Sequence, residues 1–259
     1  LDIRSNPMTP TIGSGMETWL SVREETSKWI AQHQSCPWGA WVAKLYNSPQ
    51  CDVKILDQED DPCFVGSSIV AMFDGSRKRA DAIVRGDIVA SPDVPSGSAS
   101  IACVVRTRCA HGKAHLVEIP DTGLLITPWH PVFVQRAGGS GSDGTWTFPS
   151  TLAAPREREC DAVYSFLLAA PECGDGDVDA GEGHCRARAP SFIVNSMKTV
   201  ALAHGICNDD VASHEFWGTD RVVDDLMTMK GWNEGLVQLE SGCVVRDRGT
   251  GRACGLRQL

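Results

Sequence analysis

The sequence predicts an all-β domain that follows a short helical segment. From residue 63 onward the apolar residues come in short runs rich in Val, Ile and Phe, a pattern typical of strands. Gly, Asp and Pro separate these runs, and Asp74-Gly75 is a hairpin turn signal. Many short strands at this spacing indicate a fold built from sheets with largely non-local pairings.

The first 62 residues have a helical and acidic sequence pattern instead of a strand pattern. Tryptophan and aliphatic residues share one stripe of 16–33, which predicts an amphipathic helix, and a second helical stretch is predicted at 39–46. Residues 47–62 are polar and acidic, which is typical of a linker. We therefore expect 1–62 to be a separate upstream segment.

The elements after residue 62 follow from alternating apolar residues and from turn residues. Strands are predicted at 68–73, 100–107, 115–119, 124–127, 131–135, 162–169, 191–202 and 236–246, and a turn followed by a strand is predicted within 85–90. A short helix is predicted at 221–230, and Gly-rich loops are predicted at 137–144 and 172–183.

Composition narrows the function classes. The 259 residues carry a net charge of -9, and an acidic chain repels phosphates, which argues against a nucleic-acid partner. No apolar run approaches the roughly 20 residues that span a bilayer, so no membrane association is expected.

No signal peptide is visible, and the start at Leu1 suggests a piece of a longer chain. Eleven cysteines leave at least one thiol unpaired within the chain, and an intracellular protein with reduced thiols is favoured.

Three residues carry chemistry that the chain could perform on itself. The Cys63 thiol can attack the carbonyl of Pro62 and convert that amide into a thioester. The step needs a group that holds the amide and an acid that protonates the departing amine. Thr127 can place its hydroxyl on the amide, and His130 is the expected acid because imidazole exchanges protons near neutral pH. Each motif alone is weak, but together they predict cleavage at Pro62–Cys63.

The combination resembles the Hint superfamily, which contains Hedgehog autoprocessing domains and inteins. The similarity lies in an opening block at Cys63, a Gly-Asp strand, the Thr-x-x-His block and two late blocks, which are residues 63–66, 81–89, 125–131, 163–166 and 191–204. Further motifs are most similar to the Vint type, the Hint domains of proteins that also carry a von Willebrand A domain. These motifs are residues 146–149, 202–205, 214–219 and 231–235.

The resemblance implies a horseshoe-shaped all-β fold in which the blocks meet at the centre. It implies a Hint domain over 63–255, with core blocks in 63–205 and a C-terminal extension in 206–255. It adds His204 to the three site residues, as a group that polarises the site, although a structural histidine held in a turn explains the sequence equally well. It also implies a von Willebrand A domain in the full-length protein.

Departures from the family pattern narrow the reaction. Gly205 follows His204 where inteins carry a cyclising Asn, so full splicing is disfavoured. Residues 100–108 contain no acidic side chain where Hedgehog domains carry the Asp that activates a sterol. The first half-reaction remains: Cys63 forms a thioester with its own upstream segment, and water, a thiol or an amine resolves it. Pro62 restricts the approach to the carbonyl, so cleavage is expected to be slow or absent.

The main alternative is a degenerate Hint domain that acts as a non-catalytic interaction module in a larger protein. A cysteine peptidase acting in trans would need an orienting Asn or Asp that the sequence does not indicate. No cofactor is indicated. No metal is expected, because His204, Cys207 and His214 match no zinc spacing and the acidic loop 172–183 lacks the Gly and Glu of a calcium loop.

Overall fold

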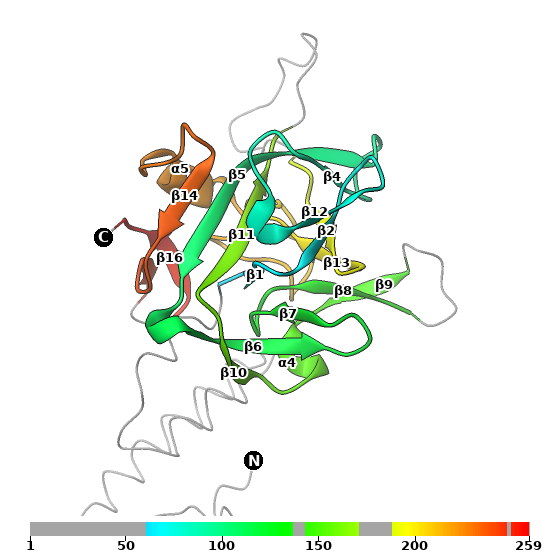
Figure 1. The fold of residues 1–259 in the computed structure, drawn as a ribbon, viewed down its shortest axis with the longest axis horizontal. Helices are drawn as coiled ribbons and strands as arrows, with labels where there is room; N and C mark the ends of the chain where they lie inside the picture. The colour runs from blue at the N-terminus through cyan, green and yellow to red at the C-terminus, as the bar shows by residue number, and fades with distance from the viewer. Residues whose placement is uncertain (1–60, 137–142, 171–187, 248–249, 259) are drawn as a thin grey trace, which may run out of the picture. The chain divides into compact units, whose positions relative to one another are not determined.

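The computed structural model describes residues 61–136, 143–170, 188–247 and 250–258. All of them belong to one compact unit, Ile55–Leu259. The two helices and most of the linker predicted before residue 61 lie outside the described residues. Strands dominate the described part (Figure 1), which confirms the all-β class. No helix within these ranges is long and apolar enough to cross a membrane.

Among the described residues the larger sheet has 8 strands, in the order β10-β6-β7-β1-β11-β5-β14, with β4 also paired to β5. Its short strand β1 lies between β7 and β11, so the residue before β1 enters the sheet near its middle. All pairings are antiparallel except that of β14 with β5. The strands are β1 (Phe64–Val65), β4 (Ile88–Ala90), β5 (Ser98–Arg108), β6 (Lys113–Ile119), β7 (Leu124–Ile126), β10 (Arg156–Glu159), β11 (Ala162–Leu168) and β14 (Leu236–Leu239).

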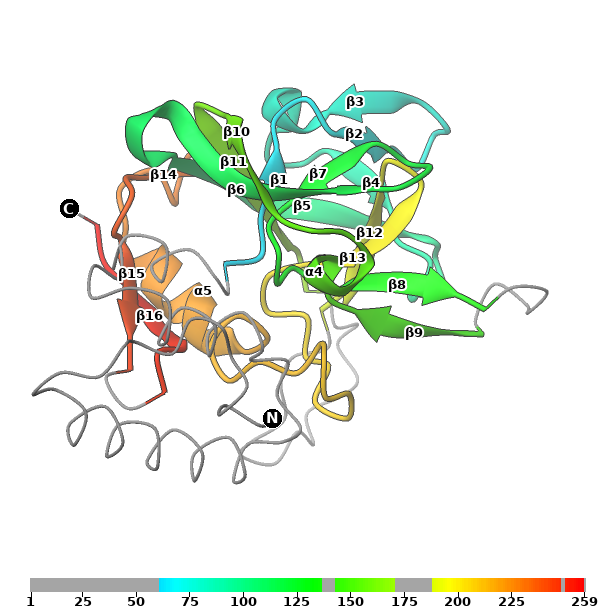
Figure 2. The ribbon, with the colours of Figure 1, turned by 90° about the horizontal axis from the view of Figure 1, so that it is seen from below.

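A second sheet has 6 strands in the order β3-β2-β12-β13-β8-β9, again counted within the described ranges. Its strands are β2 (Ile69–Ala71), β3 (Arg77–Arg79), β8 (Val132–Gln135), β9 (Gly144–Thr147), β12 (Ser191–Val194) and β13 (Met197–Val200). Strands β15 (Val244–Arg246) and β16 (Ala253–Leu256) form a separate ribbon. The α-helices in the described ranges are α4 (Pro149–Leu152) and α5 (Asp220–Met227). Helix α5 packs against β16, as Figure 2 shows.

Three phenylalanines pack against one another in the core between the two sheets. Phe64 of β1 and Phe166 of β11 have ring centroids 5.2 Å apart, and Phe192 of β12 lies 6.0 Å and 5.4 Å from them. Each ring is at most 1% exposed, and full burial of such a side chain stabilises the fold by about 2–3 kcal/mol. Phe64 therefore anchors β1 and fixes the position of Cys63 before it.

Local turn chemistry explains where the sequence predictions succeed. Asp74-Gly75 forms the predicted hairpin between β2 and β3, with Gly75 at a φ of +84°. The Asp74 carboxylate accepts the Ser76 N–H at 2.9 Å and closes this turn. Most predicted strands and the helix at α5 are confirmed within a few residues.

Two predicted strands are wrong as single elements. The stretch 191–202 is a hairpin, because Asn195 and Ser196 adopt φ values of 45° and 65° and reverse the chain between β12 and β13. Asn tolerates this left-handed conformation better than most residues. The stretch 236–246 divides into β14 and β15 at a turn containing Gly242, φ +85°.

The C-terminal extension is part of the fold rather than an appendage. Strand β14 joins the larger sheet beside β5, with Leu236 opposite Val104. A second apolar cluster joins residues of β5 and β11 to α5 and β16, with Phe216 and Leu226 buried in it. The extension therefore contributes both a strand and a core.

Candidate active site

Cys63 lies immediately before β1 and is only 5% exposed. The β1 strand pairs with β7 and β11, so the residues following β7 and the side chains of β11 surround the thiol. Its apolar neighbours include Val65, Leu116 and Val163. The nucleophile predicted from the sequence is thus enclosed by the sheet.

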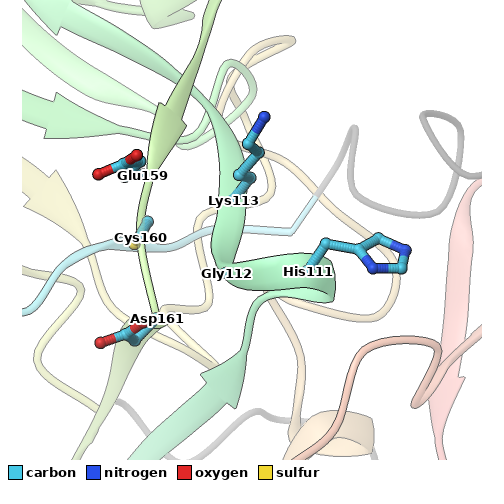
Figure 3. A pocket seen from close by; sticks show the side chains of 6 residues that line it. All are labelled: His111, Gly112, Lys113, Glu159, Cys160 and Asp161. Atoms are coloured by element: carbon cyan, nitrogen blue, oxygen red, sulfur yellow. The ribbon is translucent and has the colours of Figure 1, made fainter.

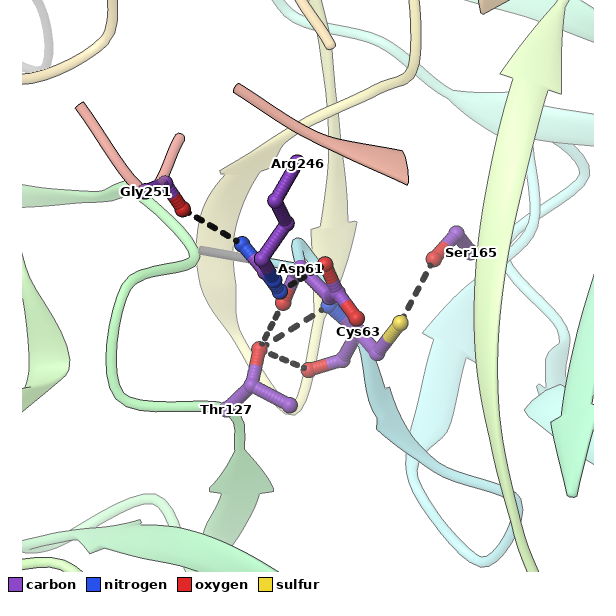
Figure 4. Close-up of polar contacts among 6 residues, drawn as sticks. All are labelled: Asp61, Cys63, Thr127, Ser165, Arg246 and Gly251. Atoms are coloured by element: carbon purple, nitrogen blue, oxygen red, sulfur yellow. Dashed lines mark hydrogen bonds and ion pairs between the residues drawn. The ribbon is translucent and has the colours of Figure 1, made fainter. Parts of the chain in front are cut away.

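Thr127 holds the amide group of Cys63. The Cys63 N–H donates to Thr127 Oγ1 at 3.0 Å, and the Thr127 N–H donates to the Cys63 carbonyl at 2.8 Å. The Thr127 hydroxyl lies 2.5 Å from the Asp61 carbonyl and 3.1 Å from that of Cys63. A hydroxyl has one hydrogen, and the shorter contact identifies Asp61 as its main acceptor. The backbone on both sides of Pro62 is therefore fixed (Figure 4).

Ser165 of β11 bridges the thiol and the preceding carbonyl. Its hydroxyl donates to the Pro62 carbonyl oxygen at 2.6 Å, and its oxygen lies 3.1 Å from Cys63 Sγ. Because the single hydroxyl hydrogen is used on Pro62, the thiol is the donor in the contact between Cys63 and Ser165. A continuous chain S–H···O–H···O=C thus runs from the nucleophile to the carbonyl that it would attack.

The Cys63 thiol is held in its neutral form. Burial raises the pKa of Cys63 well above its ordinary value, and the charge of Asp61 raises it further, while the hydrogen-bond contact with Ser165 opposes the shift. An attack by a preformed thiolate is disfavoured in this environment.

His130 is buried beside β1. Its Nε2 lies 3.1 Å from the Val200 carbonyl, which can only accept, so Nε2 carries the hydrogen and Nδ1 is bare. Nδ1 makes no hydrogen bond within the described residues. Burial lowers the pKa of His130 to about 4, although the backbones of Val200 and Cys63 partly offset the shift. At neutral pH the imidazole is uncharged, so it can act as an acid only after it has received a proton.

His204 lies close to this group. Burial lowers its pKa to about 4, and the charges of His214 and His130 lower it further. Its Nδ1 accepts the Ile206 N–H at 3.0 Å, two residues along the chain. The turn contact fits a structural histidine, and the interaction with His130 fits a residue that influences the site.

Sequence reasoning missed two contributors. Ser165 lies in the late block 163–166, but the sequence assigns it no role; its only signal is a lone hydroxyl in the apolar run Ala162–Leu168. Arg246 gave no local signal, yet its Nη2 lies 3.2 Å from Asp61 Oδ1.

A polar pocket of about 340 Å³ lies where β6 begins and β10 ends (Figure 3). It is lined by His111, Gly112, Lys113, Glu159, Cys160 and Asp161. The Cys160 side chain also packs against the apolar cluster that contains Cys63. Within the described residues, no group of three or more His, Cys, Asp or Glu side chains is arranged to hold a metal ion.

The fold and the site define the class of protein. This is a Hint domain, a class whose fold has the general capacity to process its own polypeptide. More narrowly, the chain belongs to the Vint family, whose Hint-domain profile matches residues 62–255. No curated protein matches the chain.

Solved structures of inteins are similar to part of the chain. A DnaB intein from Synechocystis sp. PCC 6803 is 13% identical, with a TM-score of 0.34 over 54% of this chain and 97% of that one. The gp41-1 intein is 14% identical, with a TM-score of 0.33 over 53% of this chain and 97% of that one. Similarity at this level carries no weight for activity.

Proposed function

We propose that this chain cleaves itself at Pro62–Cys63 through an N-to-S acyl shift. The observation that supports this most is that every reacting group is already engaged: Thr127 holds the amide N–H, and Ser165 contacts both the thiol and the carbonyl oxygen. The substrate is the chain's own upstream segment. The von Willebrand A partner and the intracellular location implied by the sequence stay predictions.

The attack proceeds without a free thiolate. The Cys63 sulfur bonds to the Pro62 carbonyl carbon while the thiol hydrogen passes to Ser165 and the Ser165 hydrogen passes to the carbonyl oxygen. The product is an uncharged tetrahedral intermediate with a hydroxyl group. Because the surroundings oppose a charged sulfur, a relay that avoids the charge is the favoured route.

Collapse of the intermediate requires a second proton transfer. The carbon–nitrogen bond breaks, the hydroxyl loses its hydrogen, and the Cys63 nitrogen gains one to leave as an amine. The bare Nδ1 of His130 accepts this proton and returns it to the nitrogen, a role for which a depressed pKa is suited. His204, which is also uncharged at neutral pH because its pKa is lowered to about 4, would polarise the site as a neutral imidazole. The upstream segment then forms a thioester between Pro62 and Cys63.

A small nucleophile completes the cleavage. Water, a thiol or an amine attacks the thioester and releases the upstream segment. The polar pocket meets the cluster around Cys63 at Cys160, which makes it the favoured entrance. The proline ring at Pro62 restricts the local backbone, so we expect slow turnover.

The alternative is a non-catalytic interaction module. The enclosed thiol, with its raised pKa, is the observation that favours it. In that case the network around Cys63 would only stabilise the fold.

Intact mass after incubation of the purified chain with hydroxylamine tests the proposal. Wild type should yield an upstream hydroxamate ending at Pro62 and a fragment beginning at Cys63, and Cys63→Ala should stay whole. Ser165→Ala should slow the reaction about 100-fold, as loss of an oxyanion donor does in other acyl transfers. Cys207→Ser, which removes an exposed thiol, is the matched control and should cleave normally.

Two other outcomes of the hydroxylamine experiment would each decide a question about the junction. An intact wild type beside a cleaved Pro62→Gly variant would show that the native junction is not competent. If both stay whole over several days, the interaction module becomes the better reading.

A further inference from the structure

A buried ion pair joins the C-terminal extension to the residue two positions before Cys63. Arg246, the last residue of β15, places Nη2 3.2 Å from Asp61 Oδ1. The two side chains are only 13% and 12% exposed, so both charges have lost most of their water. An ion pair with this little exposure is costly to break, because solvent screens its charges less than at the surface.

Figure 4 shows a backbone contact and a side-chain contact of Asp61. Its carbonyl oxygen accepts the Thr127 hydroxyl, and its carboxylate meets the Arg246 guanidinium. Asp61 and Pro62 both lie on the acyl side of the Pro62–Cys63 bond. The contacts therefore hold the segment that cleavage would release, not the domain that remains.

The C-terminal extension pre-organises the guanidinium group of Arg246. Arg246 pairs with β16, and its Nη1 lies 3.3 Å from the Gly251 carbonyl. Strand β16 is fixed in turn by α5, where Asp225 Oδ2 accepts the Leu256 N–H at 2.6 Å. A guanidinium anchored in this way loses little further freedom when it binds a carboxylate.

The acidic side chain of Asp61 takes no part in the proposed reaction. The Asp61 charge is the second largest cause of the raised pKa of Cys63. The relay proposed above uses no thiolate and no carboxylate, so the reaction alone gives no reason for an acidic side chain here. Recognition by Arg246 supplies a reason for the carboxylate at position 61.

We propose that the extension recognises the upstream segment through a carboxylate two residues before Cys63, with Arg246 as the specificity-determining residue. The inference rests on the proposed self-cleavage. It defines the substrate as a segment that ends in an acidic residue followed by Pro62, because a cation at this position would meet the guanidinium and a neutral side chain would lose the pair.

Hydroxylamine cleavage of the full chain tests the recognition. Asp61→Asn and Arg246→Gln should each slow cleavage at least ~10-fold, since each breaks a buried charge pair. Asp61→Glu should retain most of the rate. The swap Asp61→Arg with Arg246→Glu should cleave faster than either of its single changes. Glu118→Gln breaks the exposed pair with Arg158 and should leave the rate unchanged.

The inference is overturned if Asp61→Asn cleaves at the wild-type rate, or if the swap is as slow as its single changes combined. If the wild type itself stays whole, the proposed self-cleavage fails and recognition is judged by thermal unfolding. Single changes that lower the midpoint, together with recovery in the swap, would support recognition of Asp61 by the extension. Recognition would be refuted if the fall of the midpoint in the swap equals the sum of the falls in the two single changes.

Discussion

Removing the Thr127 hydroxyl should destabilise the domain as well as stop cleavage. Thr127→Val keeps the shape of the side chain but leaves the Cys63 N–H and the Asp61 carbonyl without the contacts made at 3.0 Å and 2.5 Å. Thr127 is 5% exposed, and a buried polar group left unpaired costs about 1–3 kcal/mol. The two groups together predict a loss of about 2–6 kcal/mol. For a unit of this size the midpoint should fall by roughly 5–20 °C.

Thermal unfolding measured in a Cys63→Ala background checks this value, because self-cleavage cannot then blur the transition. Thr127→Ser keeps the hydroxyl and is the matched control; it should lose much less than Thr127→Val. The reasoning fails if Thr127→Val melts with the parent protein, since the hydroxyl would then contribute nothing to the closed site.

Three further predictions follow from the same geometry. Because the pKa values of His130 and His204 are lowered from 6.5 to about 4, the unfolded chain takes up protons first as the pH falls. Stability should therefore be fully present above about pH 6.5 and decline towards pH 4, by about 3 kcal/mol per histidine. Urea unfolding measures this decline, which should be smaller in a His204→Gln variant; an equal decline in both would contradict the assignment. Gly218→Ala should cost about 2 kcal/mol or more, because the new Cβ would lie 2.8 Å from the His214 carbonyl oxygen and 2.9 Å from His204 Cε1; an unchanged melting temperature would show that the turn can move aside. In maleimide labelling of the folded chain at neutral pH, the exposed Cys207 should react first, while Cys103, whose pKa burial raises to about 11, and Cys63 should react last; early labelling of Cys63 would mean that the site opens.

The sequence predicts local features of this fold much better than distant pairings. Alternating apolar residues and the Asp74-Gly75 turn are short-range signals, and the corresponding strands and hairpin are confirmed. The Asn195-Ser196 turn was missed because it lacks glycine and interrupts an apolar stretch by only two residues. The ion pair between Asp61 and Arg246 spans 185 residues. No local pattern specifies such a pair, because it depends on how the sheets are assembled.

The candidate site was predictable only in part, because some of its residues lie in short local motifs and others are brought in by distant strand pairing. Cys63, Thr127 and His130 occur in recognisable blocks, and Thr127 does contact the Cys63 amide. The protonation state of His130 could not be read from its sequence, because burial determines it. Ser165 contributes through its position beside β1, which only strand pairing reveals.

The late position of β14 in the chain has a consequence for timing. The strand that completes one edge of the larger sheet begins at Leu236, and its parallel partner β5 ends at Arg108. During synthesis, the ribosome therefore releases Cys63 well before the residues that finish the sheet and before Arg246. A nascent chain holds its nucleophile without the strand and the guanidinium that complete its surroundings. Under the proposed self-cleavage, the site is therefore complete only after the ribosome has released Arg246.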